Sequence, residues 1–329
     1  MAIDRLRSPY NNMLAVTGDV GPAAYSNAQV GGSTPYTFIG TGATNTIVGV
    51  TYRVHLFTYT PGQNYTITFN RAGNVDLLVL AGGGGGGGAY GVNSGSNYGV
   101  SGGGGGAGGL ILSYNYGVTA TTYSLTVGKG GYDIDGLGQY YYNNAAVFAQ
   151  NSVFGALTAI RGGHGGTYSY TSYPPQTGGS GGGSGTGTLD PATSQAGAAG
   201  TAGQGNRGGN SPGYAPPYTG GGGGGYSTAG QDFVLGNTNG RAGGDGITLN
   251  FDGQSRTIAA GGGSGGYSAA SGGVGGSGGA GGAGGSGNTN GTAAAGWGNG
   301  GGGSGYTYPS LLRGGAGTDG LVIIRYPLG

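Results

Sequence analysis

The chain has 329 residues, of which 93 are glycine, and only 6% of its residues are charged. The formal net charge is +1 and the eleven basic residues are scattered, so the chain lacks the clustered positive surface by which proteins bind nucleic acids. It has no cysteine, which excludes disulfides and thiol chemistry. Lys129 is the only lysine and glutamate is absent. Because glycine is also a poor helix former, we predict an all-β or irregular fold with essentially no α-helix.

Residues 1–50 differ from the rest of the chain, because their glycine content is moderate and their apolar residues follow no clear period. They contain no apolar run of the length that a secretory signal needs, and the chain has no apolar stretch long enough for a membrane span. We predict that residues 1–50 form an N-terminal arm that docks onto other proteins or onto sister chains. The alternative is a poorly ordered terminus.

From residue 52 onwards the pattern indicates β-strands. Residues 52–57 and 65–69 flank the turn signal Pro61-Gly62. Residues 75–80 are a nearly continuous apolar run, which is typical of a strand that is covered on both faces. We predict that the strands form a small β core, closed by the last strand, that binds the ends of the glycine-rich segments together. Further strands are predicted at residues 110–114, 123–127, 246–251 and 321–326.

The glycine-rich segments show a second kind of order. Residues 272–286 read GGVGGSGGAGGAGGS, so that only every third residue carries a side chain. This interval matches the three residues per turn of a polyproline-II-type helix, and it matches neither a strand nor an α-helix. We predict that the tracts are polyglycine-II helices stacked as a layer, and that residues 51–329 form one glycine-rich domain. The alternative is that they are flexible linkers. The other tracts are residues 82–88, 102–106, 181–183, 220–225, 261–266 and 300–303.

Segments rich in tyrosine, asparagine, serine and proline lie between the tracts and are predicted to be loops: residues 89–101, 132–146, 167–177, 211–219, 226–240 and 306–311. Tyrosine offers a large rigid ring and a hydroxyl at low entropic cost, which suits recognition of glycans or protein loops. The alternative is that the rings pack on the glycine layer, although three consecutive rings at 140–142 cannot all point inward on an extended chain. The candidate ligand-binding residues are Tyr140, Tyr141, Tyr142, Tyr168, Tyr170, Tyr173, Tyr214 and Tyr218.

Catalytic and metal-binding patterns are weak. Ser180 lies in the sequence GGSGG, which fits the pattern around a nucleophilic serine, but no strand–turn–helix context surrounds it. Asp133 and Asp135 are similar to the start of a calcium loop that lacks its later acidic ligand. His55 and His164 are over 100 positions apart, with no third zinc ligand evident. We therefore expect no enzyme activity, no metal and no cofactor.

Several phrases of the sequence occur in a fixed order. Residues 75–81 read VDLLVLA and are followed by seven glycines, then by GGGGGAGGLI at residues 102–111 and TYSLTVGKGG at residues 122–131. The chain closes with GGAGTDGLVIIRY at residues 314–326. In this order the phrases resemble the glycine-rich domain of bacteriophage tail-fibre and related virion proteins. The resemblance covers roughly residues 54–326, and it leaves the first fifty residues outside.

The resemblance implies a phage virion structural protein, a tail fibre or fibre tip that attaches to the host. In the similar adhesin tips, polyglycine-II helices stack as a sandwich and carry variable loops that touch host receptors. The chain departs from those tips in its longer loops and in its β segment near the start. The implied partners are other virion proteins through residues 1–50, a host-surface glycan or outer-surface protein, and sister copies in a homo-oligomer such as a trimer. The implied location is the virion, with assembly in the host cytoplasm.

Other classes stay open on the sequence alone. A head-decoration or capsid-fibre protein would share the same composition. An ice-binding protein on a polyglycine-II scaffold needs a flat face of regularly spaced threonine or alanine, and only residues 272–286 come close to that. A surface filament and a disordered, condensing Gly/Tyr protein are further alternatives, although at least five apolar strand candidates argue against disorder.

Overall fold

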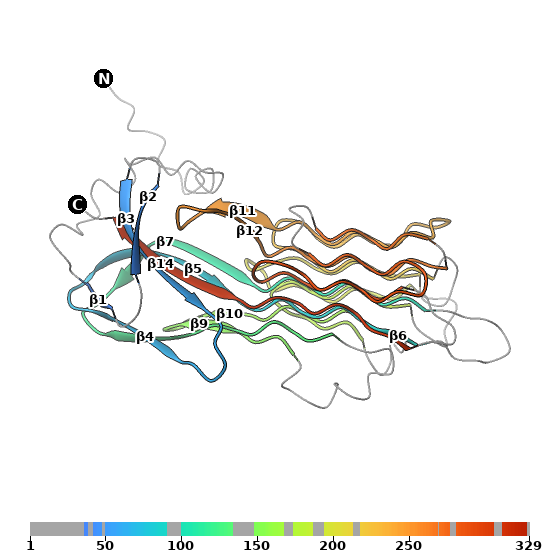
Figure 1. Ribbon diagram of the computed structural model, residues 1–329, viewed down its shortest axis with the longest axis horizontal. Coiled ribbons are helices and arrows are strands. Elements are labelled where there is room, and N and C mark those ends of the chain that lie inside the picture. The colour runs from blue at the N-terminus through green and yellow to red at the C-terminus, as the bar shows by residue number, and fades with distance from the viewer. Residues whose placement is uncertain are drawn as a thin grey trace, which may run out of the picture.

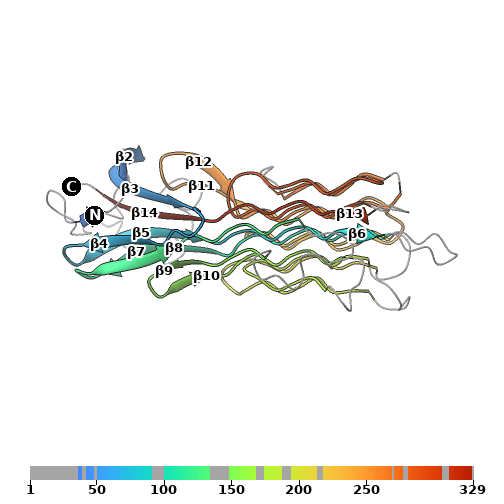
Figure 2. The ribbon, with the colours of Figure 1, turned by 60° about the horizontal axis from the view of Figure 1, so that its bottom comes forward.

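The computed structural model describes residues 36–38, 42–47, 50–90, 100–133, 148–167, 174–186, 194–212, 218–268, 270–276, 281–305 and 311–327. Two sheets lie at one end of the elongated molecule, the sheet end (Figure 1). The glycine tracts run side by side from there to the opposite end, the far end, where β6 and β13 lie (Figures 1 and 2). No described residue is helical, and the strands form antiparallel sheets, so the predicted all-β and irregular class is confirmed.

The strands form two five-stranded sheets and two small pairs. The first sheet has the order β2(Gly42–Ile47), β3(Val50–Thr58), β14(Leu321–Pro327), β5(Gly73–Leu80) and β7(Leu110–Val118). The second has the order β1(Tyr36–Phe38), β4(Tyr65–Phe69), β8(Thr122–Thr126), β9(Ser152–Phe154) and β10(Leu157–Ala159). The pairs are β11(Ile247–Asn250) with β12(Ser255–Ile258), and β6(Ala89–Tyr90) with β13(Leu311–Leu312). Each strand predicted from the sequence is present, and β14 lies in the middle of the first sheet.

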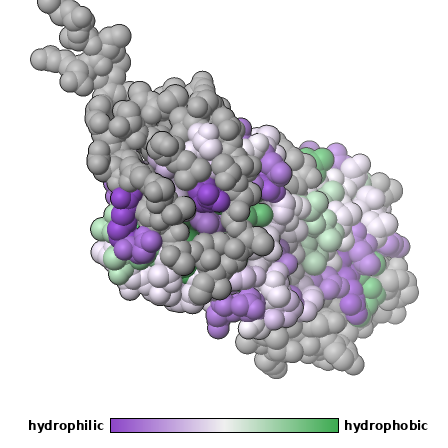
Figure 3. All heavy atoms as spheres, turned by 60° about the vertical axis from the view of Figure 1, so that its left-hand side comes forward, coloured by the Kyte–Doolittle hydropathy of each residue, from purple (hydrophilic) through white to green (hydrophobic). Residues whose placement is uncertain are grey.

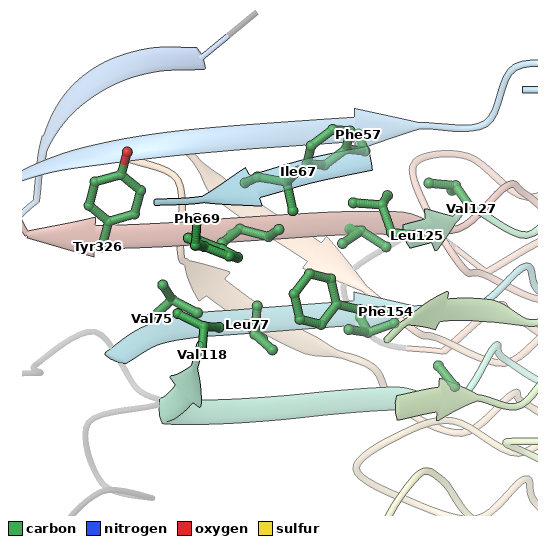
Figure 4. Packing of buried hydrophobic residues seen from close by; sticks show 14 of the residues in the cluster. Phe57, Ile67, Phe69, Val75, Leu77, Val118, Leu125, Val127, Phe154 and Tyr326 are labelled. Carbon is green, nitrogen blue, oxygen red and sulfur yellow. The ribbon is translucent and has the colours of Figure 1, made fainter. Parts of the chain in front are cut away.

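The core consists of two clusters of buried hydrophobic side chains, one on each face of the first sheet. Leu77 and Val79 of β5 belong to the cluster shared with the second sheet, whereas Leu78 and Leu80 belong to the cluster shared with the β11–β12 hairpin. Successive side chains of a strand point to opposite faces, so the continuous apolar run of β5 fills both clusters. Figure 4 shows the first cluster between the sheets, with Ile67, Phe69, Leu125 and Phe154 near Val75 and Leu77. Viewed from the sheet end, the described surface is mainly hydrophilic or neutral, with small hydrophobic areas (Figure 3).

Part of residues 1–50, the predicted N-terminal arm, contributes strands to both sheets. β2 pairs with β3 along its whole length, and β1 pairs with β4. Residues 1–35 lie outside the described residues, so the docking arm stays a prediction. The structure extends the sheet region back to residue 36, because the outer edges of β3 and β4 each accept a further strand.

A buried ion pair ties the centre of the first sheet to the hairpin. Nε of Arg325 in β14 donates to Oδ2 of Asp76 in β5 at 3.0 Å, and both side chains are at most 3% exposed. The Asn115 N–H donates to the other Asp76 oxygen at 3.1 Å. A second Arg325 nitrogen donates to the Phe251 carbonyl, and the guanidinium stacks on the rings of Tyr52 and Phe251. The charge is therefore paired, hydrogen-bonded and covered by two aromatic rings.

The tract of residues 102–107 lies at the centre of the glycine array. Its six N–H groups donate to three neighbouring tracts and its six carbonyls accept from three others, all at 2.8–3.0 Å. Residues three apart in the tract donate to the same neighbouring tract. A β-strand differs, because its backbone bonds to at most two neighbouring strands. The donor–acceptor pairs are Gly102–Ser304, Gly105–Gly301, Gly103–Gly166, Gly106–Gly163, Gly104–Gly221 and Ala107–Gly224, and the donors to its carbonyls are Gly265, Gly262, Gly87, Gly84, Gly183 and Ser180.

Glycine is required at residues 102–106 because the neighbouring backbones lie where side chains would be. A Cβ on Gly104 would overlap the Gly262 carbonyl, and a Cβ on Gly103 would overlap the Gly183 carbonyl. Since neighbours surround the tract on all sides, the array is several tracts deep. The expectation of one layer is therefore too simple, because a tract with three equivalent directions for donors and for acceptors bonds out of a plane as readily as within it.

In the outer tracts, exposed residues recur at every third position. In residues 281–286, Ala283 and Ser286 are exposed while Gly282 and Gly285 are buried. The same alternation occurs in residues 271–276, where Val274 is exposed. On another outer tract, Ala196 and Ala199 are exposed and Ala198 between them is buried. In these tracts the side chains therefore stand at outward positions, whereas the inward positions that touch other backbones are mostly glycine. Residues 277–280 of the tract that suggested this interval lie outside the described residues.

Replacing Gly104 by alanine is expected to lower the free energy of unfolding by about 1–3 kcal/mol, because the added methyl group must displace neighbouring backbone. The matched control is Gly117→Ala on the exposed edge of β7, where the nearest atom to an added Cβ is 3.8 Å away. Urea denaturation of both variants measures the difference. Equal stability of the two variants would contradict the close approach of the tracts.

Replacing Arg325 by methionine is expected to lower the free energy of unfolding by about 3–5 kcal/mol, because the Asp76 carboxylate stays buried without the guanidinium charge. Arg207→Met is the control, since the Arg207–Asp232 pair is 47% and 40% exposed and such pairs contribute about 0–1 kcal/mol. The same denaturation experiment compares them. A cost for Arg325→Met no larger than for Arg207→Met would show that the buried pair is dispensable.

Candidate functional site

Residues that flank different loops bond to one another at the far end. Ser101 N–H donates to the Thr186 hydroxyl at 2.7 Å, and the Thr186 N–H donates back to the Ser101 carbonyl at 3.0 Å. The Ser101 hydroxyl donates to the carbonyl of Tyr218 at 2.8 Å. These three residues stand next to segments 91–99, 187–193 and 213–217, which lie outside the described residues. The chain therefore enters or leaves three loops at one place.

Two further loops connect to the same end. Tyr90 and Leu311, at the boundaries of segments 91–99 and 306–310, are backbone partners in the β6–β13 pair. Gly103 donates to the carbonyl of Gly166, which lies just before segment 168–173. Most of the predicted loops thus begin or end at the far end, away from the sheets.

The tyrosine candidates fall into three groups. Tyr168, Tyr170, Tyr173 and Tyr214 belong to segments outside the described residues whose flanking residues are at the far end. Tyr140, Tyr141 and Tyr142 also lie outside the described residues, in segment 134–147. At the two flanks of that segment, Asp133 pairs with Arg313 at 3.3 Å next to β13, and Phe148 stacks on His164.

Tyr218 is the candidate that the structure describes. It is 9% exposed, and its ring packs against that of Tyr267 with 5.2 Å between the ring centroids. Its φ of +51° is unusual for a residue with a bulky side chain, and the bond from Ser101 fixes its carbonyl. The ring of Tyr218 therefore packs within the protein, which was the alternative to a role in ligand binding.

Sequence reasoning treated residues 226–240 as one loop, and the structure divides them. Gly230 and Gln231 bond to Arg207 and Ala242 as a further short tract. A turn follows, and Val234 and Leu235 in it are 53% and 81% exposed. The signal in the sequence was the Gly236-Asn237 dipeptide, which marks a turn directly after apolar residues.

Ser180, His55 and His164 are buried, Asp133 is partly exposed, and Asp135 lies outside the described residues. Ser180 is fully buried, and its hydroxyl lies against Gly205. Nδ1 of His164 donates to the Gly165 carbonyl at 3.0 Å, while its ring stacks on Phe148. Within the described ranges, no three histidine, aspartate or glutamate side chains gather in a group that could hold a metal ion.

Burial controls the charge of both histidines. Loss of hydration, together with a smaller effect of the nearby Arg53, lowers the pKa of His55 to about 4. Burial likewise lowers the pKa of His164 to about 4, with Arg161 acting in the same direction and the bond to Gly165 opposing it. Both imidazoles are therefore neutral at pH 7 and act as packed aromatic rings.

The part of the chain that the structure describes contains no helix of the length and hydrophobicity that a membrane crossing requires. No curated protein matches the sequence. A family model described as "Glycine-rich domain" matches residues 59–327, from the residue after β3 to the end of β14. That span includes most of the strands and all of the tracts described above, and the chain belongs to this glycine-rich domain family.

Proposed function

We propose that this chain is a phage virion structural protein, a tail-fibre or fibre-tip component that presents loops for attachment to the host surface. The observation that carries the proposal is the separation of two ends. β1 and the end of β14 lie at the sheet end, whereas most loops connect at the far end (Figure 1). One end can thus join the particle through residues 1–50 and sister chains while the other faces the host.

Within this proposal the tracts are polyglycine-II helices. Bonding to the same neighbour at every third residue supports this, as does the exposure of every third residue in the outer tracts. Because the N–H and C=O groups of residues 102–107 are all bonded at 2.8–3.0 Å, the scaffold resists bending without side chains. Rigidity of this kind fixes the loop ends in space and leaves the loops free to vary in sequence.

The loops supply the contact surface of the proposal. Tyr168, Tyr170, Tyr173 and Tyr214 lie in segments that start or end at the far end, and the Tyr140–Tyr142 run lies in segment 134–147, which follows the Asp133–Arg313 pair. Tyrosine rings bind glycans or protein loops at a low entropic cost, so a host-surface glycan or outer-surface protein fits as the partner.

The location is tested by a gold-labelled antibody against this chain on intact virions. We expect the label at the tail, because the proposed arm docks on tail components. Label confined to the head would exclude the fibre and favour the decoration protein. Quantitative mass spectrometry gives an independent count, since a head-decoration protein is present in far more copies than a fibre.

The triple change Tyr140→Ala, Tyr141→Ala and Tyr142→Ala is expected to slow adsorption of the virion to host cells by about tenfold or more, because it removes three aromatic contacts. The melting temperature of the purified chain should not change. The matched variant with phenylalanine at the three positions keeps the rings and should retain most of the adsorption. Unchanged adsorption of the alanine variant would remove this run from the contact surface.

A further inference from the structure

An exposed apolar turn lies at the far end. The Asn237 N–H donates to the Val234 carbonyl at 3.0 Å, and Gly236 in the third position has a φ of +79°, which fits a type II turn. Val234 is 53% exposed and Leu235 is 81% exposed. We call residues 234–237 the apolar turn.

Neighbouring segments hold the apolar turn on both sides. The Phe233 N–H donates to the Asn210 carbonyl at 3.0 Å, and the Asn210 N–H donates to the Asp232 carboxylate at 2.8 Å. On the other side, the Tyr267 N–H donates to the Thr238 carbonyl at 3.0 Å. The turn is therefore preorganised, so a partner that binds Val234 and Leu235 does not have to order them.

The turn stands beside the loop connections described above. Tyr267, which bonds to the segment following the turn, packs its ring against Tyr218. The Tyr218 carbonyl in turn accepts a hydrogen bond from the hydroxyl of Ser101, which bonds to residues at the ends of two other loops. The apolar turn is therefore an ordered part of the end that the proposed function directs toward the host.

The charges around the turn argue against a phosphate-rich surface as its partner. Arg207, at the base of the turn, is bound by both oxygens of Asp232 at 2.8 and 2.9 Å. Arg241 is 6% exposed and donates to the Asn239 carbonyl. Anionic lipid headgroups are attracted by exposed clusters of lysine or arginine, and the described residues around the turn offer two guanidinium groups that are already engaged.

We propose that Val234 and Leu235 insert into an apolar recess of a host outer-surface protein. This inference rests on the proposed function and narrows its partner from a glycan or a protein to a protein. Two adjacent aliphatic side chains on a fixed turn suit such a recess, because a buried apolar anchor surrounded by polar groups is the usual centre of a protein–protein contact.

The test measures binding of the labelled full-length chain to cells on which the virion propagates. Leu235→Asp and Val234→Asp are expected to weaken binding by about tenfold or more. Val274→Asp is the matched control, because Val274 is 67% exposed but lies within a tract, where its carbonyl accepts from the Gly243 N–H. It should change binding less than about twofold. Leu235→Ala, which adds no charge to the turn, should weaken binding in the same direction, and melting temperatures verify that each variant is folded.

Two further probes identify the class of partner. Protease treatment of the cells should abolish binding, and vesicles of phosphatidylethanolamine and phosphatidylglycerol should not bind the chain. Undiminished binding of Leu235→Asp, an equal loss with Val274→Asp, protease-resistant binding or binding to the vesicles would each overturn this inference while leaving host attachment standing. Failure of the unsubstituted chain to bind the cells would overturn the proposed function and this inference together.

Discussion

The interaction on which the rest of the structure depends is the backbone hydrogen bond between neighbouring glycine tracts. Each net bond contributes roughly 0.5–1.5 kcal/mol, and fixing a glycine costs roughly 0.5–1 kcal/mol more than fixing an alanine. A residue of the central tract donates one bond and accepts one, which amounts to one bond per residue. Because fixing the backbone of any residue already costs roughly 1–2 kcal/mol, these bonds alone do not offset the entropy lost on ordering the tracts. The apolar clusters of the sheets supply the remaining stabilisation.

The sheets also give the tracts their alignment. A run of identical residues has no side chains to define which residue lies opposite which. Residues 82–87 continue directly from β5, the tract at 102–109 leads into β7, and residues 313–320 lead into β14. Because β14 and β7 both pair with β5 in the first sheet, three tracts start in fixed register. The buried apolar strands at the sheet end thus set the register of the glycine tracts, which have no side chains that could set it.

The sequence predicts the local features and leaves out the long-range ones. The apolar run at 75–80 identified a strand covered on both faces, and the interval of three in residues 272–286 was the interval of exposure. The partners of residues 102–107 could not be predicted, since each neighbour presents the same glycines. The Arg325–Asp76 pair joins residues 249 positions apart, and nothing local marks it. Among the candidate contacts, Tyr218 packs within the protein. Gly236-Asn237 marks the apolar turn in the sequence, but the exposure of Val234 and Leu235 was missed, because neither composition nor spacing distinguishes a packed loop residue from a protruding one.

The threefold exposure of the outer tracts restricts how such a chain can change in length. Removing Gly282 would move Ala283 and Ser286 to positions that now face the backbone of neighbouring tracts. Removing three residues would restore the outward positions and shorten the tract by one interval of three. Insertions and deletions within tracts should therefore be tolerated only in multiples of three residues. The loops can lengthen by any number of residues.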